Sequence, residues 1–460
     1  MKPLIDGSLA TVAILVCGFL APGRAYAHPN HPPAPVLSIT TDITWSEHIR
    51  PIFREKCMNC HSPAGIVTRE FDLSTYTGSN ELSGARDWVR SIEELVLAKR
   101  MPPWGADFRF GSFSNQRFLS QDEIEKIVAW TRGGRPQGPQ KGLPTPDEFL
   151  KRDWLLGTPD QVYEMPRPHV MAPGVADSQV SFSFPIELAS GEKWITAVEF
   201  FPGDPTIVHT AMAFIHDPVS DLPYTLDLEV AKKYDLMTGW DETIEIRQKT
   251  YASGTRFLGQ WVRGDGPVSF PAGTGRLLRD GSTLELKIFY HRNPYDAEYE
   301  ESQDRSKFGI HFSTEEVQGV SESIVIENKE FVVQADEPNR EVRAFATLGE
   351  AGHLYAVYPH MGPLGKDLEL LALYPDGRSV TLLLISEYEY ILNQSYIFEK
   401  PLFAPAGTRL ELIAHYDNSS ENWNNPNDPP KDVAAPEEER LLLYVDYIAA
   451  DRIYRPKLSP

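Results

Sequence analysis

The chain has 460 residues, of which 44 are basic and 65 are acidic, so its formal net charge at pH 7 is −21. A surface this acidic repels nucleic acids and anionic lipids, which argues against a DNA- or RNA-binding role. The length allows roughly two to four domains of about 100–200 residues each.

Residues 1–27 have the pattern of a secretory signal peptide. Lys2 provides a positive start, an apolar run covers Leu9–Leu20, and small residues stand at Ala25 and Ala27. The run is too short to span a bilayer. We therefore expect cleavage before His28, no transmembrane segment in the mature chain, and a periplasmic or secreted protein.

The cysteine content is informative once the signal peptide is removed. Cys17 leaves with the signal, so only Cys57 and Cys60 remain, in a mature chain with 42 basic and 64 acidic residues and a net charge of −22. An exported protein of this size therefore has no disulfide framework, and two thiols three residues apart need a chemical explanation. Residues 28–42 are rich in proline and predict an extended tether.

Residues 43–136 are predicted to form a small all-α domain. Three helices are expected: one that follows a capping box at Thr44 and Glu47 and leads to Cys57, one over Asp87–Lys99, and one that begins at Ser120, boxed by Glu123, and ends at Gly133–Gly134. The two prolines of Met101-Pro102-Pro103-Trp104 exclude a helix there.

Residues 137–156 contain a linker rich in Pro, Gly, Gln and Lys, and short alternating runs such as Leu284–Tyr290 follow it. Many short strands separated by Gly and Pro turns predict antiparallel β-sandwiches. The stretch is long for one sandwich, so we expect two, over residues 157–318 and 319–460. Residues 418–431 predict a long solvated loop, with calcium binding as the alternative.

Cys57-Met58-Asn59-Cys60-His61 is the signature of covalent haem attachment. Two thiols add to the porphyrin vinyl groups, and the adjacent histidine becomes the proximal iron ligand. A structural zinc site needs four ligands, and no second cysteine pair exists. A thioredoxin-like redox pair should lie between a strand and a helix, whereas this pair follows a predicted helix and is followed immediately by His61. The sequence therefore predicts one haem c, bound by Cys57, Cys60 and His61.

The sixth iron ligand is a separate prediction. Cytochromes of this kind commonly use a methionine thioether. Met58 lies inside the attachment loop and cannot reach the opposite haem face, whereas Met101 lies forty residues beyond His61 at a predicted helix end. Met101 is therefore the expected axial ligand, with His48 as the alternative.

Two known families share motifs with this sequence. Residues 44–104 resemble the bacterial cytochrome c domain that carries Cys-x-x-Cys-His followed by Met-Pro-Pro-Trp. The part from Gly157 onward resembles the copper type II ascorbate-dependent monooxygenases, which include peptidylglycine α-hydroxylating monooxygenase. The matching segments are Gly203–Met212, Phe270–Thr274, Leu284–His291, Pro359–Met361, Tyr374–Gly377 and Ala414–Asn418. This resemblance implies two tandem eight-stranded jelly rolls.

The monooxygenase resemblance implies one copper in each sandwich, but most ligand positions are changed. The first site's His-His pair corresponds to His209-Thr210, and its later His-Tyr to Phe289-Tyr290, with His291 close by. The second site's His-x-His corresponds to residues 360–362 and retains only its first histidine, and no methionine follows Met361.

A lone imidazole gives copper neither affinity nor defined geometry. The expected state therefore lacks the family's copper, with His209, His291 and His360 as remnants. A rearranged site, for instance His209 with His216 or His291, is the alternative.

Three functions follow as expectations. The first is an electron-transfer cytochrome that serves a periplasmic redox partner and carries a sandwich pair without copper chemistry. The second is a copper monooxygenase that receives electrons from the fused haem. The third is a carbohydrate- or peptide-binding module with an accessory haem. Because fold alone does not decide function, the number of metal ligands favours the first.

Overall fold

The computed structural model describes residues 42–58, 60–62, 71–79, 82–139, 154–189, 191–218, 255–292, 301–390, 392–436 and 438–453. The signal peptide predicted over residues 1–27, nearly all of the predicted tether, and most of the predicted linker lie outside these residues. Within the described segments, no helix is both long and apolar enough to cross a membrane.

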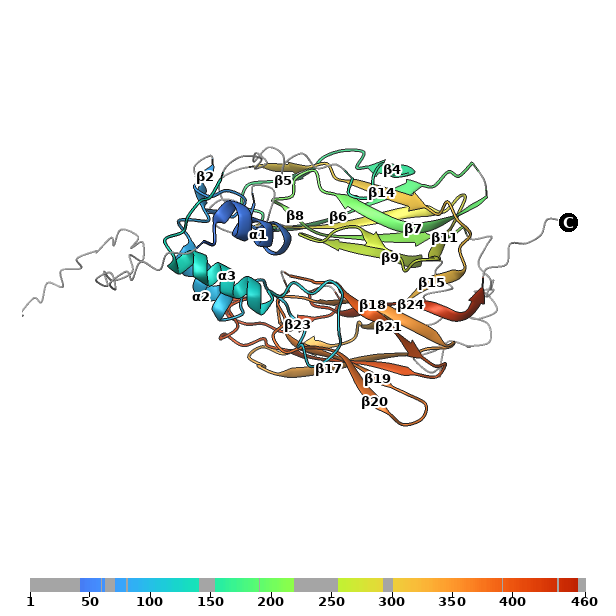
Figure 1. The fold of residues 1–460 in the computed structure, drawn as a ribbon. Helices are drawn as coiled ribbons and strands as arrows, with labels where there is room; N and C mark the ends of the chain where they lie inside the picture. The colour runs from blue at the N-terminus through green and yellow to red at the C-terminus, as the bar shows by residue number, and fades with distance from the viewer. Residues whose placement is uncertain are drawn as a thin grey trace, which may run out of the picture.

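Figure 1 shows a helical part at one end of two β-sandwiches that lie one above the other. The helical elements are a π-helical turn η1 (Trp45–Ile49) and the helices α1 (Arg50–Lys56), α2 (Val89–Leu97) and α3 (Gln121–Arg132). They enclose a small core in which the Trp45 ring lies 5.5 Å from Phe53 and 5.7 Å from Trp130, centroid to centroid. The aromatic cluster holds η1 against α3.

The helix ends test the capping predictions. The Ser120 hydroxyl accepts from Glu123 N, and the Glu123 carboxylate accepts from Ser120 N, so the predicted capping box is confirmed. The predicted box at Thr44 is wrong, because Thr44 caps no backbone N–H with its side chain. Its own N–H instead donates to His48 Nδ1 at 3.1 Å, and the first turn is π-helical.

The helical part also contains a short three-stranded sheet, so the all-α expectation for residues 43–136 was too simple. Its strands are β1 (Phe71–Asp72), β2 (Gly78–Ser79) and β3 (Leu82–Gly84), in the order β1-β3-β2. The buried Asp72 carboxylate accepts from Ser74 N at 2.7 Å and from Thr75 Oγ1 at 3.2 Å, which closes the turn after β1. This local side-chain bonding competes with helix formation.

The first sandwich packs two sheets around one core. One sheet contains β4 (Gln161–Glu164), β7 (Glu192–Phe201), β10 (Val268–Ser269), β11 (Thr274–Arg279) and β14 (Lys307–Phe312); the other has the order β6 (Asp177–Pro185), β12 (Thr283–His291), β8 (Val208–His216), β9 (Thr255–Val262). A separate ribbon pairs β5 (His169–Met171) with β13 (Ser302–Asp304).

The second sandwich has the same two-sheet plan. One sheet has the order β21 (Tyr396–Ala404), β18 (Gly352–Met361), β24 (Leu441–Ile453), β15 (Gly319–Asn328); the other has the order β17 (Arg340–Thr347), β22 (Arg409–Tyr416), β19 (Gly365–Leu373), β20 (Ser379–Ile385). β16 (Val332–Val333) pairs with β23 (Val433–Ala434). As predicted, this part of the chain is predominantly antiparallel β-structure.

The two sandwiches are joined by a buried interface. β11 pairs with β15 through Thr274 and Gly319, which makes one nine-stranded sheet from strands of both sandwiches. Across the interface, Arg276 forms a fully buried ion pair with Asp446 at 2.6 Å. Nearly every residue of β8 and β18 is buried, as expected for strands covered on both faces.

Residues 103–117, which we call the strap, connect the helical part to the second sandwich. Ala106 and Phe113 form bridges to Ile385 of β20 and Phe398 of β21. Trp104 packs on Tyr396 with ring centroids 5.1 Å apart. The strap therefore contributes side chains to the second sandwich's core.

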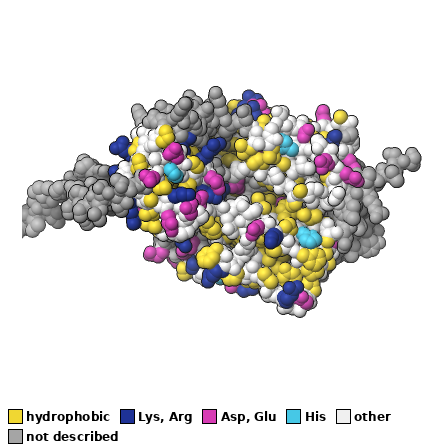
Figure 2. Space-filling view, viewed as in Figure 1, with side chains coloured by type: hydrophobic (Ala, Val, Ile, Leu, Met, Phe, Trp, Pro, Cys, Tyr) yellow, Lys and Arg dark blue, Asp and Glu magenta, His cyan; other side chains and the backbone are white. Residues whose placement is uncertain are grey.

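The described surface of the helical part mixes charges of both signs. Figure 2 shows basic and acidic side chains interspersed over the helices, while apolar side chains gather on the second sandwich. On this face the described residues form no extended basic stripe of the kind that tracks a phosphate backbone.

Candidate functional site

The predicted haem motif forms one turn that continues α1. Cys57 caps the helix, its N–H donating to Phe53 O at 2.8 Å. The N–H groups of Cys60 and His61 then both donate to Cys57 O, at 3.1 and 2.9 Å. The two thiols are not joined in a disulfide. One turn thus carries two sulfur atoms and an imidazole in the order that haem attachment requires.

Burial sets the charge state of these groups. It raises the pKa of Cys57 to about 12, with smaller contributions from Cys60 and Glu123. It also raises the pKa of Cys60, against the opposing effect of Arg117 and Arg263, and lowers the pKa of His61 to about 4. Redox-active cysteine pairs have depressed pKa values instead. The turn therefore carries neutral thiols and a neutral imidazole at pH 7.

The candidate axial ligands occupy different environments. Met58 is buried in the helical core. Met101 is partly exposed just after α2, where its N–H donates to Leu95 O at 3.3 Å. His48 Nδ1 is engaged by Thr44 N. Met101 stands two residues before the strap, so the segment that is predicted to ligate iron continues directly into the contact with the second sandwich.

Two arginines bring the motif turn next to the first sandwich. Arg117 of the strap forms a 2.5 Å ion pair with Asp265, which follows β9. Arg263 lies close enough to Cys60 for each to shift the other's pKa. Neither arginine belongs to a local motif, so sequence reasoning missed both. Only the fold brings the strap, the β9 end and the thiols together.

Arg263 also connects this turn to the candidate histidines. Its backbone N–H donates to His209 O at 3.1 Å. Its guanidinium donates to Val208 O at 2.8 Å and to His291 O at 3.4 Å. A single buried arginine therefore contacts the ends of both histidine-bearing strands.

A β-bulge on β8 redirects His209. Along β12, Phe289 pairs with Thr210 but Tyr290 pairs with Val208, so His209 is the extra residue. A bulge re-aims the side chain of the extra residue, here so that His209 points to the same face of the sheet as Thr210. In agreement, His209 Nδ1 lies 2.8 Å from the Thr210 hydroxyl.

His209 and His291 lie side by side at this strand end. Their ring centroids are 5.9 Å apart with an interplanar angle of 73°. His291 Nδ1 lies 2.7 Å from Asp177 Oδ1, and the Tyr390 ring of the second sandwich lies 6.2 Å from the His291 ring. The structure therefore brings together one of the two rearranged pairs that the sequence suggested.

The other suggested pair is not brought together. His216 lies at the far end of β8, where its Nε2 contacts Glu285 Oε2 at 2.7 Å and its Nδ1 contacts Thr255 Oγ1 at 2.9 Å. In the second sandwich, His415 Nδ1 similarly contacts Asp367 Oδ1 at 2.6 Å. Both are ordinary carboxylate-bound strand histidines.

His360 is the buried histidine of the second sandwich. It lies on β18 with 4% of its surface exposed, and its Nε2 has no hydrogen-bond partner among the described residues. Burial, together with charge repulsion from Arg440 and His209, lowers its pKa to about 3. His360 is therefore a neutral imidazole at pH 7, close enough to His209 for the two to interact electrostatically.

The Glu439 carboxyl group fills the space beside Gly362, which stands two residues after His360. A Cβ placed on Gly362 would lie 2.8 Å from Glu439 Cδ. The buried carboxylate accepts from Gly362 N and, at 3.1 Å, from Leu364 N. Burial raises the pKa of Glu439 to about 7, although these bonds oppose the shift. The place that the resemblance assigns to a second copper histidine is thus filled by a carboxylate.

No preformed metal centre is present in the part of the chain that the structure describes: no three His, Cys, Asp or Glu side chains are arranged to hold an ion. The loop over residues 418–431 is organised by amides, because Asn418 Nδ2 donates to three backbone carbonyls and its Oδ1 accepts from Asn425.

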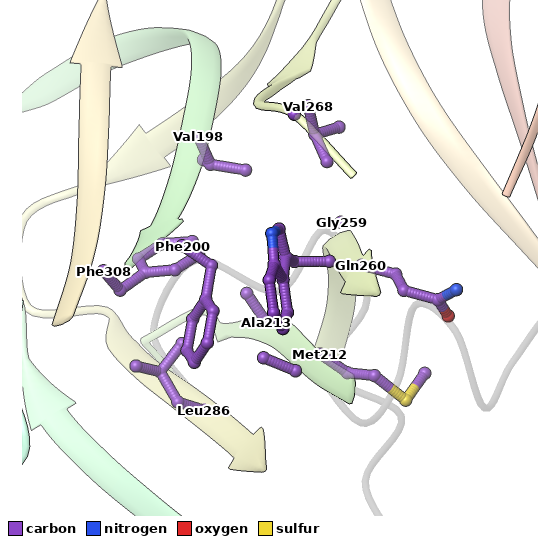
Figure 3. A pocket seen from close by; sticks show the side chains of 12 residues that line it. Val198, Phe200, Met212, Ala213, Gly259, Gln260, Val268, Leu286 and Phe308 are labelled. Atoms are coloured by element: carbon purple, nitrogen blue, oxygen red, sulfur yellow. The ribbon is translucent and has the colours of Figure 1, made fainter. Parts of the chain in front are cut away.

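A pocket inside the first sandwich carries no ionisable side chain (Figure 3). Phe200, Trp261 and Leu286 surround it, while Gln260 points away and donates to Asn393 O at 2.8 Å. A space lined in this way offers neither acid–base groups nor metal ligands. It belongs to the apolar core.

Comparisons with known proteins find low-identity structural likenesses and no matching family. No known family profile matches the sequence, and no curated protein does. Among solved structures, the major capsid protein P2 of bacteriophage PM2 is 12% identical over 63% of this chain and 99% of its own, with a TM-score of 0.23. PNGF-II is 9% identical over 74% and 72%, also with a TM-score of 0.23.

The VP2 subviral particle of infectious bursal disease virus is 9% identical over 64% of this chain and 73% of its own, with a TM-score of 0.19. Scores this low carry no argument about family or activity.

Proposed function

We propose that this protein is an exported c-type cytochrome with one haem, and that it transfers electrons to or from a periplasmic redox partner. The observation that carries the proposal is the turn after α1, where two unbridged thiols and an imidazole follow one another as Cys57, Cys60 and His61. Residues 43–136 then form a cytochrome c domain, and the sandwiches form jelly rolls that act as scaffold and docking surface.

The donor set fits a covalently bound haem. Such a group supplies a reversible one-electron iron couple. Cys57 and Cys60 would hold it through thioethers, and His61 would ligate the iron. The hydrogen bonds from Cys60 N and His61 N to Cys57 O fix the turn that orients these side chains. Met101 is the proposed second protein ligand of the iron.

A copper monooxygenase is the second candidate, because His209 and His291 lie 5.9 Å apart at their ring centroids. The family's own sites do not fit the chain. Thr210 and Phe289 occupy two first-site positions, and Glu439 fills the space at Gly362 in the second. We therefore derive no oxygenase step, and expect no ascorbate-driven hydroxylation of glycine-extended peptides.

Covalent attachment is the decisive test. Protein produced in a periplasm with haem-attachment machinery should show a haem-stained band on a denaturing gel and the mass of one added haem. Cys57→Ser with Cys60→Ser should abolish both signals. Met58→Leu, between the two cysteines, should retain them. Haem that acid-acetone extracts from the unmodified protein contradicts the proposal.

The axial ligand has its own test. Met101→Ala should retain the haem, lose the thioether-to-iron charge-transfer band of the oxidised spectrum, and lower the reduction potential. Met58→Leu should leave band and potential unchanged, because Met58 is buried in the helical core. A band that persists in Met101→Ala, or a bis-histidine spectrum before any substitution, refutes Met101 and directs attention to His48.

A further inference from the structure

We propose that Gln394, which precedes β21 in the second sandwich, is a positioning residue for the haem iron, because its side chain holds the segment that follows Met101. The inference rests on the proposed function, since it takes Met101 as an iron ligand. It adds that the strength of this ligand depends on a contact between Gly105 and Gln394, which are 289 residues apart in the chain.

One buried amide group holds the backbone on both sides of Trp104. Gln394 is 6% exposed; its Oε1 accepts from Gly105 N at 3.1 Å, and its Nε2 donates to Pro103 O at 3.0 Å. The amide matches its two partners in this orientation only, because Gly105 N donates and Pro103 O accepts. Gln394 therefore fixes both the position and the direction of the strap where it begins.

This contact is separated from Met101 by residues of restricted geometry. Pro102 and Pro103 lie between Met101 and the part of the strap that Gln394 holds, and each proline ring fixes φ. On its other side, Met101 N donates to Leu95 O at 3.3 Å, at the end of α2. Met101 is thus held between α2 and the second sandwich, so a displacement of the strap changes where its thioether can reach.

Packing leaves this part of the strap little room to move. The Trp104 and Tyr396 rings lie 5.1 Å apart, centroid to centroid, and Tyr396 is 2% exposed. A Cβ placed on Gly105 would lie 2.8 Å from the Tyr396 hydroxyl. The absence of a side chain at Gly105 therefore allows the strap to approach closely enough for Gln394 to bind it.

A second amide fastens the strap further along. Asn115 Nδ2 donates to Ser395 O at 2.8 Å, and Asn115 Oδ1 accepts from Ile397 N at 3.1 Å. Here the amide belongs to the strap and the backbone to the second sandwich, the reverse of the arrangement at Gln394. Of these two amides, Gln394 is the one that bonds to the segment next to Met101.

The chemistry of the ligand makes such support useful. A thioether is a weak acceptor, and imidazole added to the solution competes with it, because imidazole is a good ligand for iron. A loop that is already in place binds without the entropy cost of becoming ordered. The two hydrogen bonds of Gln394 should therefore strengthen ligation by Met101 relative to ligands from solution.

The test titrates the oxidised full-length haem protein with imidazole and follows the loss of the thioether-to-iron charge-transfer band. Gln394→Leu keeps most of the side-chain volume and removes its donor and acceptor. It should retain the haem and raise the apparent affinity for imidazole roughly tenfold, as expected for the loss of two hydrogen bonds. Gly105→Ala, whose Cβ would press on Tyr396, should change the affinity in the same direction.

The matched control is Asn418→Ala. It removes a buried amide of the same sandwich, which donates to the carbonyl groups of Val333, Gln334 and Lys431. It should lower the unfolding midpoint without changing the affinity for imidazole, which separates positioning from stability. An unchanged affinity in Gln394→Leu overturns the inference, as does an equal rise in Asn418→Ala.

Met101→Ala distinguishes this inference from the proposed function. If Met101→Ala loses the band while Gln394→Leu leaves the imidazole affinity unchanged, only the role of Gln394 is refuted. A band that persists in Met101→Ala refutes the assignment of the ligand and this inference with it. Haem attachment to Cys57 and Cys60 is judged separately, by the haem-stained denaturing gel.

Discussion

Strands β8 and β18 each carry a buried histidine near one end, and the residues around these two strand ends are arranged differently. At the start of β8, a bulge makes His209 the extra residue, and its ring centroid lies 5.9 Å from that of His291. At the end of β18, His360 is followed by Gly362, whose surroundings are filled by the Glu439 carboxyl group. Both ends retain histidines, but only the first brings two together. Convergence therefore depends on the packing around a strand end as much as on residue identity.

The two ends are also anchored differently. Arg263 ties His209 and His291 to the β9 end, which lies beside Cys60. Glu439 ties Gly362 and Leu364 to the start of β24 within the second sandwich alone. Among these contacts, only those of the first strand end lead to the turn that carries Cys60.

The largest expected effect comes from breaking the buried ion pair between the two sandwiches. Arg276→Met leaves Asp446 buried without its cation, since that carboxylate is fully enclosed and 2.6 Å from the guanidinium. Removing one partner of a buried ion pair costs about 3–5 kcal/mol. Denaturant unfolding should show this loss. Arg343→Met, which removes an exposed guanidinium that pairs with Glu341 and Glu411, is the control and should change the unfolding midpoint little. Equal effects of the two substitutions contradict the interface described here.

The next effect concerns Glu439 and pH. Burial raises its pKa to about 7, so the folded state binds its proton more tightly than the unfolded chain does. The protonated form stabilises the fold below pH about 4.5, and this stability is lost as pH rises through about 7. The difference is roughly 3 kcal/mol. Glu439→Gln should flatten the dependence of unfolding free energy on pH between these values. An unchanged slope contradicts the assignment.

A smaller effect on stability tests whether the Glu439 carboxyl group fills the space beside Gly362 after β18. Gly362→Ala places a Cβ 2.8 Å from Glu439 Cδ, and overpacking of this kind costs about 1–3 kcal/mol. The cost should shrink in a Glu439→Ala background, where the clash is absent. Gly191→Ala, at a position with open space around the added Cβ and no positive φ, controls for the loss of a glycine. Additive effects of Gly362→Ala and Glu439→Ala would show that the two do not interact.

Local signals predicted local structure. The Ser120–Glu123 box and the stop at Gly133 were predictable because capping needs only residues within one turn. Alternating runs predicted strands for the same reason, since the pattern has a period of two. The motif turn at Cys57 and Cys60 also follows from consecutive residues.

Features that depend on distant residues were not predictable. The strap contacts β20 and β21 almost 300 residues later in the chain, as in the Ala106–Ile385 and Phe113–Phe398 bridges. Arg263 lies in no motif, and the role of Glu439 follows only from its packing against Gly362. The bulge at His209 is a mismatch between two strands, which neither strand reveals alone. The arrangement of the histidines therefore required the fold.

The smallest expected effect compares the copper affinity gained by adding histidines at the β8 end with that gained at the β18 end. Thr210 and Phe289 are cross-strand partners beside His209, with Cβ atoms of such pairs about 4.5–5.5 Å apart. Thr210→His with Phe289→His should therefore add imidazoles that converge with His209, and raise copper affinity at least tenfold, or about 1.4 kcal/mol. Gly362→His should raise it little, because Glu439 occupies the space that the ring needs. Competition titration of both variants against the unmodified protein measures the difference. A gain from Gly362→His that matches the double variant means that the second strand end is as open as the first.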